Sequence, residues 1–417
     1  MNIKTILFPV LILALVSSAC SAVITQADQP VVENLQAAAT VVPTALPTAT
    51  AEPAPIMQSV EQSQPAQLIS APLTVGPNPS DVPAGYNPLT GLPVSDPSTL
   101  ELPAVLISIT NFPPSSRPQA GLSFSPWVFE IYIAEGMTRY LAAFYGDFPK
   151  TISADGQQDA NQPPTAEVGP VRSGRLPYVY IRDFFQNSCL VYAGATYQIR
   201  ARLRGCAMVF GDDSSNINSA MLDVTRLQKI AEQNKRPSDA FNYTGNLFNA
   251  TPSEQGAPAS LINVYYSLLN QGQWQYDTAS GAYLKLTDFA DGSGKFTPAT
   301  DRLTGKQLAF ANVVVLHTEH TVLNPYIIDV KMGPGETGKA TIFRDGQKFE
   351  AFWTTINGEY EQTTGLRRPL RFVDANGKPF ALKPGQTWVH IVTNPSEVQD
   401  QGSGQWKLRF YAPAGAK

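Results

Sequence analysis

Cysteine and histidine are scarce in this chain of 417 residues, which contains only three of each. A structural zinc site needs four Cys or His ligands, so we predict no metal site. Charged residues make up 15% of the sequence, against roughly 25% in ordinary globular domains. The net charge is −4, whereas modules that bind nucleic acid usually have a strongly basic face. The composition therefore excludes a dedicated nucleic-acid binder.

Basic residues are also missing from the N-terminal quarter, since no Lys or Arg occurs between Lys4 and Arg117. Residues 21–76 are rich in Ala, Pro, Thr, Val and Gln and show no hydrophobic period. Proline removes backbone donors and disfavours helix. We predict that residues 21–76 form a disordered, partly polyproline tether.

The first twenty residues have the pattern of an export signal. Lys4 precedes an apolar run, Ile6–Val16, and small residues then lead to Cys20. The run is too short to span a hydrocarbon core of ~30 Å comfortably. Cys20 stands where a lipoprotein signal places its lipidated cysteine; an ordinary cleaved signal is the alternative. We predict a signal peptide over 1–20 and an extracytoplasmic protein that is lipid-anchored to the cell membrane at Cys20.

The predicted first globular domain, residues 81–255, mixes strands and helices. Apolar runs and alternation predict strands or helices in the following segments: strand Leu102–Thr110, a hairpin of Trp127–Ala134 and Thr138–Tyr145, helix Leu176–Phe185, and helix Asp223–Asn234 with Asp223 as its cap. We predict an α/β domain with a mixed, partly parallel sheet.

A strand–helix–strand unit follows within that domain: Cys189–Tyr192, Tyr197–Arg204 and Ala207–Phe210. Such a crossover predicts parallel strands. Cys189 and Cys206 stand at the starts of the two strands, about 5 Å apart if the strands are neighbours. Export permits a disulfide between them; two buried free thiols are the alternative.

The predicted second domain, residues 261–417, is mostly antiparallel and β-rich, which makes the whole chain α+β or α/β in class. The predicted strands are Asn312–Thr321, Tyr326–Lys331, Lys339–Arg344, Lys348–Thr355, Leu370–Val373, Thr387–Val392 and Trp406–Tyr411. Asp345-Gly346 and Asn376-Gly377 are hairpin-turn signals. We predict a short helix over Ser260–Asn270 between the domains.

Two motifs in the second domain resemble sites that we do not expect. Gly333–Lys339 resembles a phosphate loop, but Ala340 replaces the Ser or Thr and a strand pattern follows, so we predict a β-turn and no nucleotide. His317 and His320 are oddly spaced and would point to opposite faces of a strand.

Four motifs occur in a fixed order: Asn87–Gly91, Arg117–Leu122, Glu135–Arg139 and Gly169–Arg175. Together they resemble the YerB-like bacterial lipoproteins, a family built from two domains of unknown function. The likeness covers roughly residue 86 to the C-terminus. It implies an extracytoplasmic, membrane-anchored protein and supplies no established activity.

Four arginines in these motifs stand among Pro and Gly: Arg117, Arg139, Arg172 and Arg175. Arg172 and Arg175, at i and i+3, would share one side of a helical first turn, with Ser173 as a cap or donor. Guanidinium forks at a helix start form a good anion receptor. The strand end at Tyr192–Thr196 would lie at the same cleft.

Two other interpretations stay open. Glu130 falls nearly opposite Arg139 in the predicted hairpin, so the pair could be a cross-strand ion pair, and Arg172 and Arg175 could be partners of Glu135. Alternatively, Glu130 and Glu135 could act as acid and base of a hydrolase on a wall polymer, which needs carboxyl groups ~5–9.5 Å apart.

We predict an accessory protein that binds an anionic cell-wall component or an envelope protein, without cofactor, and we assign no catalytic residue. The predicted ligand-binding residues are the polar members of the motifs and their neighbours: Asn111, Arg117, Gln119, Glu130, Glu135, Thr138, Arg139, Arg172, Ser173 and Arg175.

Overall fold

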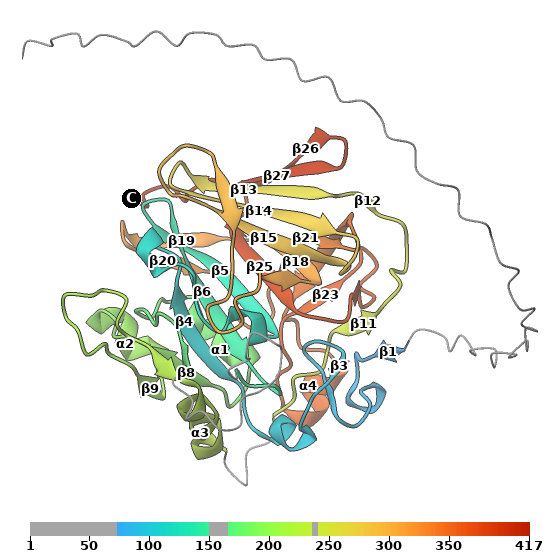
Figure 1. The fold of residues 1–417 in the computed structure, drawn as a ribbon. Coiled ribbons are helices and arrows are strands. Elements are labelled where there is room, and N and C mark those ends of the chain that lie inside the picture. The colour runs from blue at the N-terminus through green and yellow to red at the C-terminus, as the bar shows by residue number, and fades with distance from the viewer. Residues whose placement is uncertain (1–72, 150–165, 236–240) are drawn as a thin grey trace, which may run out of the picture. The chain divides into compact units, whose positions relative to one another are not determined.

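The computed structural model describes residues 73–149, 166–235 and 241–417 (Figure 1). The predicted signal peptide, Cys20 and most of the predicted tether lie outside these residues. The end predicted for the tether is wrong by a few residues. β1 (Thr74–Val75) pairs with β11 (Leu247–Asn249), and Val75 is buried opposite Phe248. Regular structure therefore begins before residue 76.

The largest sheet has 11 strands and contains strands from both predicted domains. Its order is β12 (Ala257–Pro258), β22 (Gln347–Thr354), β21 (Thr337–Arg344), β18 (Asn312–Thr318), β25 (Thr387–Thr393), β5 (Trp127–Ala134), β6 (Met137–Phe144), β4 (Val105–Thr110), β8 (Cys189–Tyr192) and β9 (Ala207–Met208), with β23 (Arg371–Val373) paired to β22. β25 pairs in parallel with β5. Residues 81–255 and 261–417 are thus joined through one continuous sheet.

The same sheet is mixed in direction. The pairs β18–β25, β25–β5, β4–β8 and β8–β9 are parallel, and the pairs β5–β6, β4–β6, β18–β21 and β21–β22 are antiparallel. The predicted hairpin is confirmed as β5–β6. The predicted turn at Asp345-Gly346 is confirmed as well, since it joins β21 to β22 with both residues at positive φ.

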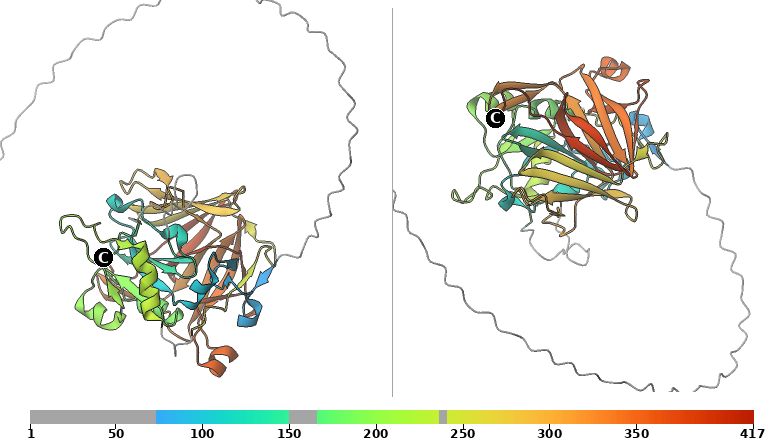
Figure 2. Two further views of the ribbon diagram at one scale, coloured as in Figure 1. Left: turned by 60° about the horizontal axis from the view of Figure 1, so that its bottom comes forward. Right: turned by 90° about the horizontal axis from the view of Figure 1, so that it is seen from above.

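A second sheet of seven strands packs against one face of the first (Figure 2). Its order is β16 (Phe296–Pro298), β15 (Ala282–Asp288), β14 (Asn270–Asp277), β13 (Leu261–Ser267), β27 (Gln405–Arg409) and β26 (Glu397–Gly402), with β17 (Ala309–Phe310) paired to β15. The helix predicted over Ser260–Asn270 is wrong. Burial alternates along β13, with Ile262, Val264 and Tyr266 buried, and that period of two belongs to a strand.

The large sheet has apolar residues on both faces. Val128, Tyr140 and Trp388 belong to the core shared with the second sheet and with α3 (Val224–Asn234). Phe129 and Leu141 face the opposite core, which includes residues of α1 (Tyr178–Phe184) and α2 (Tyr197–Leu203). Because side chains alternate along a strand, adjacent residues of β5 and β6 enter different cores.

The remaining elements are short. In the described part of the chain they are β2 (Tyr86–Asn87), β3 (Leu92–Pro93), β7 (Glu167–Val168), β10 (Leu222–Asp223), β19 (His320–Asn324), β20 (Ile327–Val330), β24 (Ala381–Leu382), α4 (Glu359–Thr364) and the 3-10 helices η1 (Pro79–Asp81), η2 (Pro97–Glu101), η3 (Pro114–Ser116) and η4 (Leu122–Phe124). His317 and His320 lie on different strands, β18 and β19. Gly333 and Glu336 close a turn that leads into β21, with 3.4 Å between Glu336 N and Gly333 O; the prediction of a turn there is confirmed.

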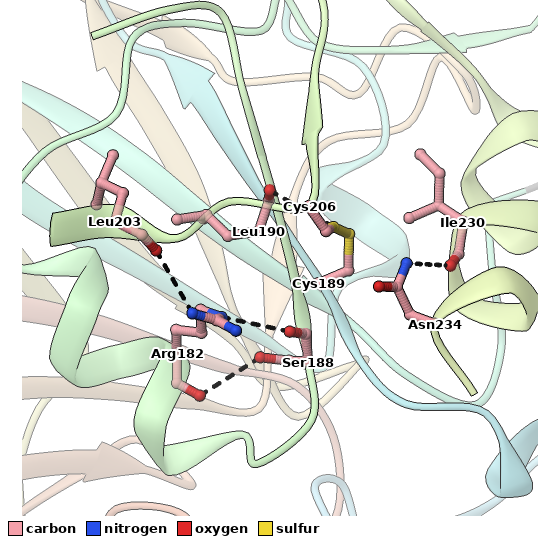
Figure 3. The surroundings of a disulfide bond; sticks show 8 residues. All are labelled: Arg182, Ser188, Cys189, Leu190, Leu203, Cys206, Ile230 and Asn234. Carbon is pink, nitrogen blue, oxygen red and sulfur yellow. Dashed lines mark hydrogen bonds between the residues drawn. A yellow bond between two sulfur atoms is a disulfide. The ribbon is translucent and has the colours of Figure 1, made fainter. Parts of the chain in front are cut away.

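The strand–helix–strand unit is present as β8, α2 and β9, with the two strands parallel. A disulfide joins Cys189 to Cys206 across it, with 5.4 Å between their Cα atoms. Figure 3 shows Arg182 of α1 beside the bridge, where its guanidinium donates hydrogen bonds to the carbonyls of Ser188 and Leu203. The disulfide therefore links the two strands of the unit at the end that Arg182 of α1 also contacts.

Candidate functional site

The register of the β5–β6 hairpin separates two residues that the sequence analysis placed together. Glu130 pairs with Tyr140, and Ile131 pairs with Arg139. Glu130 therefore points to one face of the sheet and Arg139 to the other. The predicted cross-strand ion pair of Glu130 with Arg139 is wrong, because a shift of one residue exchanges the faces.

Glu130 is the centre of a buried polar network between the two sheets, and it is only 3% exposed. Its Oε1 accepts a hydrogen bond from Thr138 Oγ1 at 2.7 Å. Its Oε2 accepts one from Trp388 Nε1 at 3.1 Å and lies 3.2 Å from His390 Nδ1. The carboxylate is thus held by donors from two strands of the large sheet.

His390, on β25, is fully buried in this network, and its contacts define its tautomer. Trp274 Nε1 donates to His390 Nε2 at 3.0 Å. An indole N–H can only donate, so Nε2 bears a lone pair and the proton sits on Nδ1, facing Glu130. Burial, and secondarily the charge of Lys285, holds the pKa of His390 well below its usual value. His390 is therefore neutral; its Nδ1 lies 3.2 Å from Glu130 Oε2 and shares a hydrogen bond of 3.2 Å with the Tyr266 hydroxyl.

Lys285 on β15 completes the network from the second sheet. Its Nζ lies 4.0 Å from Glu130 Oε2, and 4.6 and 4.5 Å from the ring centroids of Trp274 and Trp388. Burial lowers the pKa of Lys285, while the Glu130 charge opposes that shift. Two indole faces and a carboxylate all favour the ammonium form.

A cavity of about 240 Å³ lies beside Lys285, between the two sheets. Arg117 and Gln119 line it, but their hydrogen bonds are used within the protein. Arg117 donates to the Asp288 carbonyl at 2.6 Å and lies 3.2 Å from the Asp288 carboxylate, and Gln119 Nε2 donates to the Thr110 carbonyl. Asn111 also lines the cavity and donates to Thr138 Oγ1 at 2.7 Å.

Arg139 lies on the opposite face and is 7% exposed. Its Nη1 donates to the Ser173 carbonyl at 3.2 Å and lies 3.5 Å from Ser173 Oγ. Its Nε is buried without a partner, and so is the Nε of Arg175. Arg172 donates to Asn218 Oδ1 at 2.9 Å. We call Arg139, Arg172 and Arg175 the arginine cluster.

The arginine cluster has no carboxylate neighbour among the described residues. The pKa of Arg139 is lowered to about 9, chiefly by burial; Tyr178 opposes this shift, and the charges of Arg175 and Arg172 add to it. Glu135, the predicted partner of Arg172 and Arg175, is exposed at the hairpin turn and lies 3.4 Å from Lys417 Nζ. The structure therefore does not form the predicted ion network.

The backbone that presents this cluster is extended. α1 begins at Tyr178, so the predicted helical turn over Arg172 and Arg175 is wrong. Instead, Arg172 N donates to the Ser108 carbonyl at 2.9 Å, and Ala193 N donates to the Arg172 carbonyl at 2.8 Å. These two hydrogen bonds hold Arg172 between the ends of β4 and β8, in place of the hydrogen bonds that a helix would have formed.

The ten predicted ligand-binding residues thus divide into groups. One group lies on the face of the large sheet that packs against the second sheet: Asn111, Arg117, Gln119, Glu130 and Thr138. Another group lies on the opposite face of the large sheet: Arg139, Arg172, Ser173 and Arg175. Glu135 lies at the turn between β5 and β6. The predicted convergence of four arginines is wrong, because Arg117 is separated from the other three by the sheet. Glu130 lies four residues before the end of β5, and Glu135 lies in the turn after it. The strand between them is about 13 Å long, so the two residues do not form the predicted carboxylate pair.

His390, Lys285 and Tyr140 were missed by the sequence analysis. The signal available was a lone ionisable residue within an apolar strand, as for His390 in Thr387–Thr393. No spacing in the sequence indicates that β25, β15 and β6 bring these side chains to one place. Among the described residues, no group of three His, Cys, Asp or Glu side chains is arranged to hold a metal ion.

Similarity to known proteins shows the family of this chain. The DUF3048 N-terminal domain, a domain of unknown function, matches residues 89–256, and the DUF3048 C-terminal domain matches residues 262–389. A Bacillus subtilis protein named "Putative lipoprotein YerB" is 27% identical over 324 residues, covering 73% of this chain and 85% of the relative. The chain belongs to the YerB-like family.

The fold of this YerB-like chain also has a solved counterpart. The crystal structure of the Bacillus subtilis YerB protein is similar with a TM-score of 0.54 at 24% identity, covering 74% of this chain and 96% of that one. Within the described part of the YerB-like chain, no helix is long and apolar enough to cross a membrane.

Proposed function

We propose that this protein is a lipid-anchored extracytoplasmic lipoprotein whose arginine cluster binds an anionic group of a cell-envelope component. The observation that supports the proposal is the buried Arg139 guanidinium, which has two like charges near it and no carboxylate among the described residues. The relative's name and the lipoprotein pattern at Cys20 support the location.

The energetics favour a ligand for this cluster. Removing an ion from water costs several kcal/mol unless a counter-charge is supplied. The lowering of the pKa of Arg139 to about 9 means that its surroundings disfavour the charged form by several kcal/mol. At neutral pH the group stays charged, so a bound oxyanion would recover that energy through charge-assisted hydrogen bonds.

The arrangement also favours a ligand that reaches it from the surface. Three half-buried residues are near the buried Arg139: Ser173 accepts its hydrogen bond, and the charges of Arg172 and Arg175 act on its pKa. Guanidinium forks match phosphate and carboxylate oxygens in a bidentate manner. A phosphate or carboxylate group that projects from an envelope polymer fits this chemistry.

Replacing Arg139 by methionine tests the proposal, because ligand binding and stability should change in different directions. We expect at least a tenfold loss of affinity for poly(glycerol phosphate), measured by calorimetry, with a melting temperature equal to or above that of the natural protein. The physical reason is that the variant removes a buried charge with no counter-charge. Arg175→Gln should also weaken binding by about tenfold.

The matched control is Arg302→Gln, since Arg302 is exposed and donates to the Pro118 carbonyl away from the cluster. It should leave the affinity within twofold. Rising salt should weaken the natural protein's binding. A lower melting temperature in Arg139→Met with unchanged polymer binding would show that the arginine is architectural, and the proposal would be wrong.

The anchor is tested separately by Cys20→Ala. Because several acyl chains hold a protein firmly at a bilayer, we expect the natural protein in the membrane fraction and the variant in the soluble fraction after cell breakage. Cys206→Ser, which removes a cysteine of the folded part, should stay with the membrane. A variant that remains membrane-bound contradicts anchoring through Cys20.

A further inference from the structure

The cavity beside Lys285 lies between the two sheets, on the face of the large sheet opposite the arginine cluster. It is therefore independent of the anion site proposed above. Its volume is about 240 Å³. For comparison, an apolar cavity of about 150 Å³ accommodates benzene, so this one has room for a molecule moderately larger than benzene.

Two buried donors line the cavity without an acceptor. Lys285 is 5% exposed and Tyr140 is 3% exposed. Within the described part of the chain, neither Lys285 Nζ nor the Tyr140 hydroxyl makes a hydrogen bond; the nearest carboxylate oxygen, on Glu130, is 4.0 Å from Nζ. Both side chains pack on the indole of Trp388, with Nζ 4.5 Å and the Tyr140 ring 4.9 Å from its ring centroid. The two donors thus line the same cavity and contact the same indole ring.

Two other polar side chains of the lining, Arg117 and Gln119, are already engaged. Arg117 is paired with Asp288 and with the carbonyl and side chain of Asn111, and Gln119 donates to the Thr110 carbonyl. Lys285 and Tyr140 present an ammonium and a phenol as charged and phenolic donors, beside the hydroxyls of three threonines of the lining. A buried donor without an acceptor costs free energy, so the group that fits here is an acceptor. An ammonium favours a negatively charged one.

The rest of the lining is mostly apolar. Its apolar side chains are Pro114, Pro118, Phe289, Pro298, Ala299 and Leu308, and three threonines, Thr287, Thr297 and Thr300, line it as well. A ligand with a charged end and an apolar body would place its charge at Lys285 and its body against these side chains.

We infer that this cavity binds a small organic acid, whose carboxylate accepts hydrogen bonds from Lys285 Nζ and Tyr140 Oη. The apolar body of the acid packs against Phe289, Pro298 and Leu308. Glu130 holds Lys285 from the other side, and because Glu130 is itself satisfied by Thr138 and Trp388, the protons of Nζ stay available to the ligand.

The inference is tested by titrating the full-length protein with acetate, hexanoate and benzoate, and with benzamide as the uncharged counterpart of benzoate. We expect hexanoate and benzoate to bind more tightly than acetate, because only they fill the apolar part. Benzamide should bind at least tenfold more weakly than benzoate, because it lacks the charge. Binding is measured by calorimetry and by the ligand-induced rise in melting temperature.

Two variants locate the acid. Tyr140→Phe keeps the ring on Trp388 and removes one donor, and we expect benzoate affinity to fall roughly tenfold. Lys285→Met should abolish detectable binding; if that variant does not fold, Tyr140→Phe alone decides. The matched control is Lys378→Met, at an exposed position, which should leave benzoate affinity unchanged.

Failure of this inference is distinguishable from failure of the anion-polymer proposal. Absence of binding by all three acids at 10 mM, roughly the limit of the method, overturns the inference. Unchanged benzoate affinity in Tyr140→Phe also overturns it. A third outcome is that Arg139→Met loses benzoate binding whereas Tyr140→Phe binds benzoate as the natural protein does. That result would place the acid at the arginine cluster and not in the cavity.

Discussion

Glu130→Gln is expected to lower the free energy of unfolding by about 3–5 kcal/mol, the usual cost of breaking a buried charge network by removing one partner. The amide that replaces Oε2 would set an N–H against the N–H of Trp388 and the Nδ1 proton of His390. It would also remove the carboxylate oxygen that lies 4.0 Å from Lys285 Nζ. The measurement is equilibrium unfolding in denaturant at pH 7.

Glu135→Gln is the matched control, because it makes the same chemical change in the same hairpin. Glu135 is exposed, and its ion pair with Lys417 joins two partly exposed side chains. Such pairs contribute about 0–1 kcal/mol, so this variant should unfold close to the natural protein. Equal losses in the two variants would mean that the network around Glu130 does not stabilise the fold.

A double variant separates the loss of the carboxylate from the stranding of the lysine. Glu130→Gln combined with Lys285→Met should be less destabilising than the sum of the two single changes, since neither charge is then left alone. A coupling of about 1–3 kcal/mol is expected for residues in one network. Simple additivity would show that the two side chains do not interact.

Reduction of the Cys189–Cys206 disulfide is expected to lower the free energy of unfolding by about 3 kcal/mol, as for a loop of about 15 residues in the chain-entropy account. The bridge spans a sequence separation of 17 and encloses β8 and α2. It anchors the unit whose Ala193 and Gly194 hold the segment of Arg172 and Gly174 through backbone hydrogen bonds. Equilibrium unfolding with and without reductant measures the difference.

The control for this experiment is the double variant Cys189→Ala with Cys206→Ala, which should unfold alike in both conditions. Its midpoint should match that of the reduced natural protein. If the reductant leaves the midpoint of the natural protein unchanged, the bridge does not contribute to stability. In that case the surrounding contacts, such as those of Arg182 in Figure 3, suffice to hold the unit.

Local patterns predicted individual elements well. The β5–β6 hairpin follows from alternation around a Gly-containing turn, and α3 follows from its helical period and from Asp223, whose side chain accepts from the backbone N–H groups of Thr225 and Arg226. β13 was missed because a short apolar run without a flanking turn signal is ambiguous between helix and strand. Its pairing with β14 and β27 made it a strand.

The site was harder to predict because a face depends on a register. A one-residue difference in the pairing of β5 with β6 moves Arg139 from beside Glu130 to the opposite side of the sheet. A bulge between Tyr132 and Ala134, near the turn, shifts the pairing of β5 with β6. Counting residues outward from the turn therefore does not give the correct cross-strand partners. Residues that are close in sequence were therefore assigned to one site although they lie in two.

By itself, the sequence determined the family, the strand–helix–strand unit with its cysteine pair, and which motifs collect the polar residues, because each depends on local order along the chain. Only the tertiary structure decided that Glu130 meets His390 and Lys285, and that Arg139 lies with Arg172 and Arg175. The contacts of Glu130 depend on the parallel pairing of β25 with β5 and on the packing of the second sheet. Neither leaves a spacing that can be read in the chain, since His390 and Lys285 are more than a hundred residues from Glu130. The place of Arg139 depends on the register of β5 with β6 and on the backbone hydrogen bonds that hold residues 172–174.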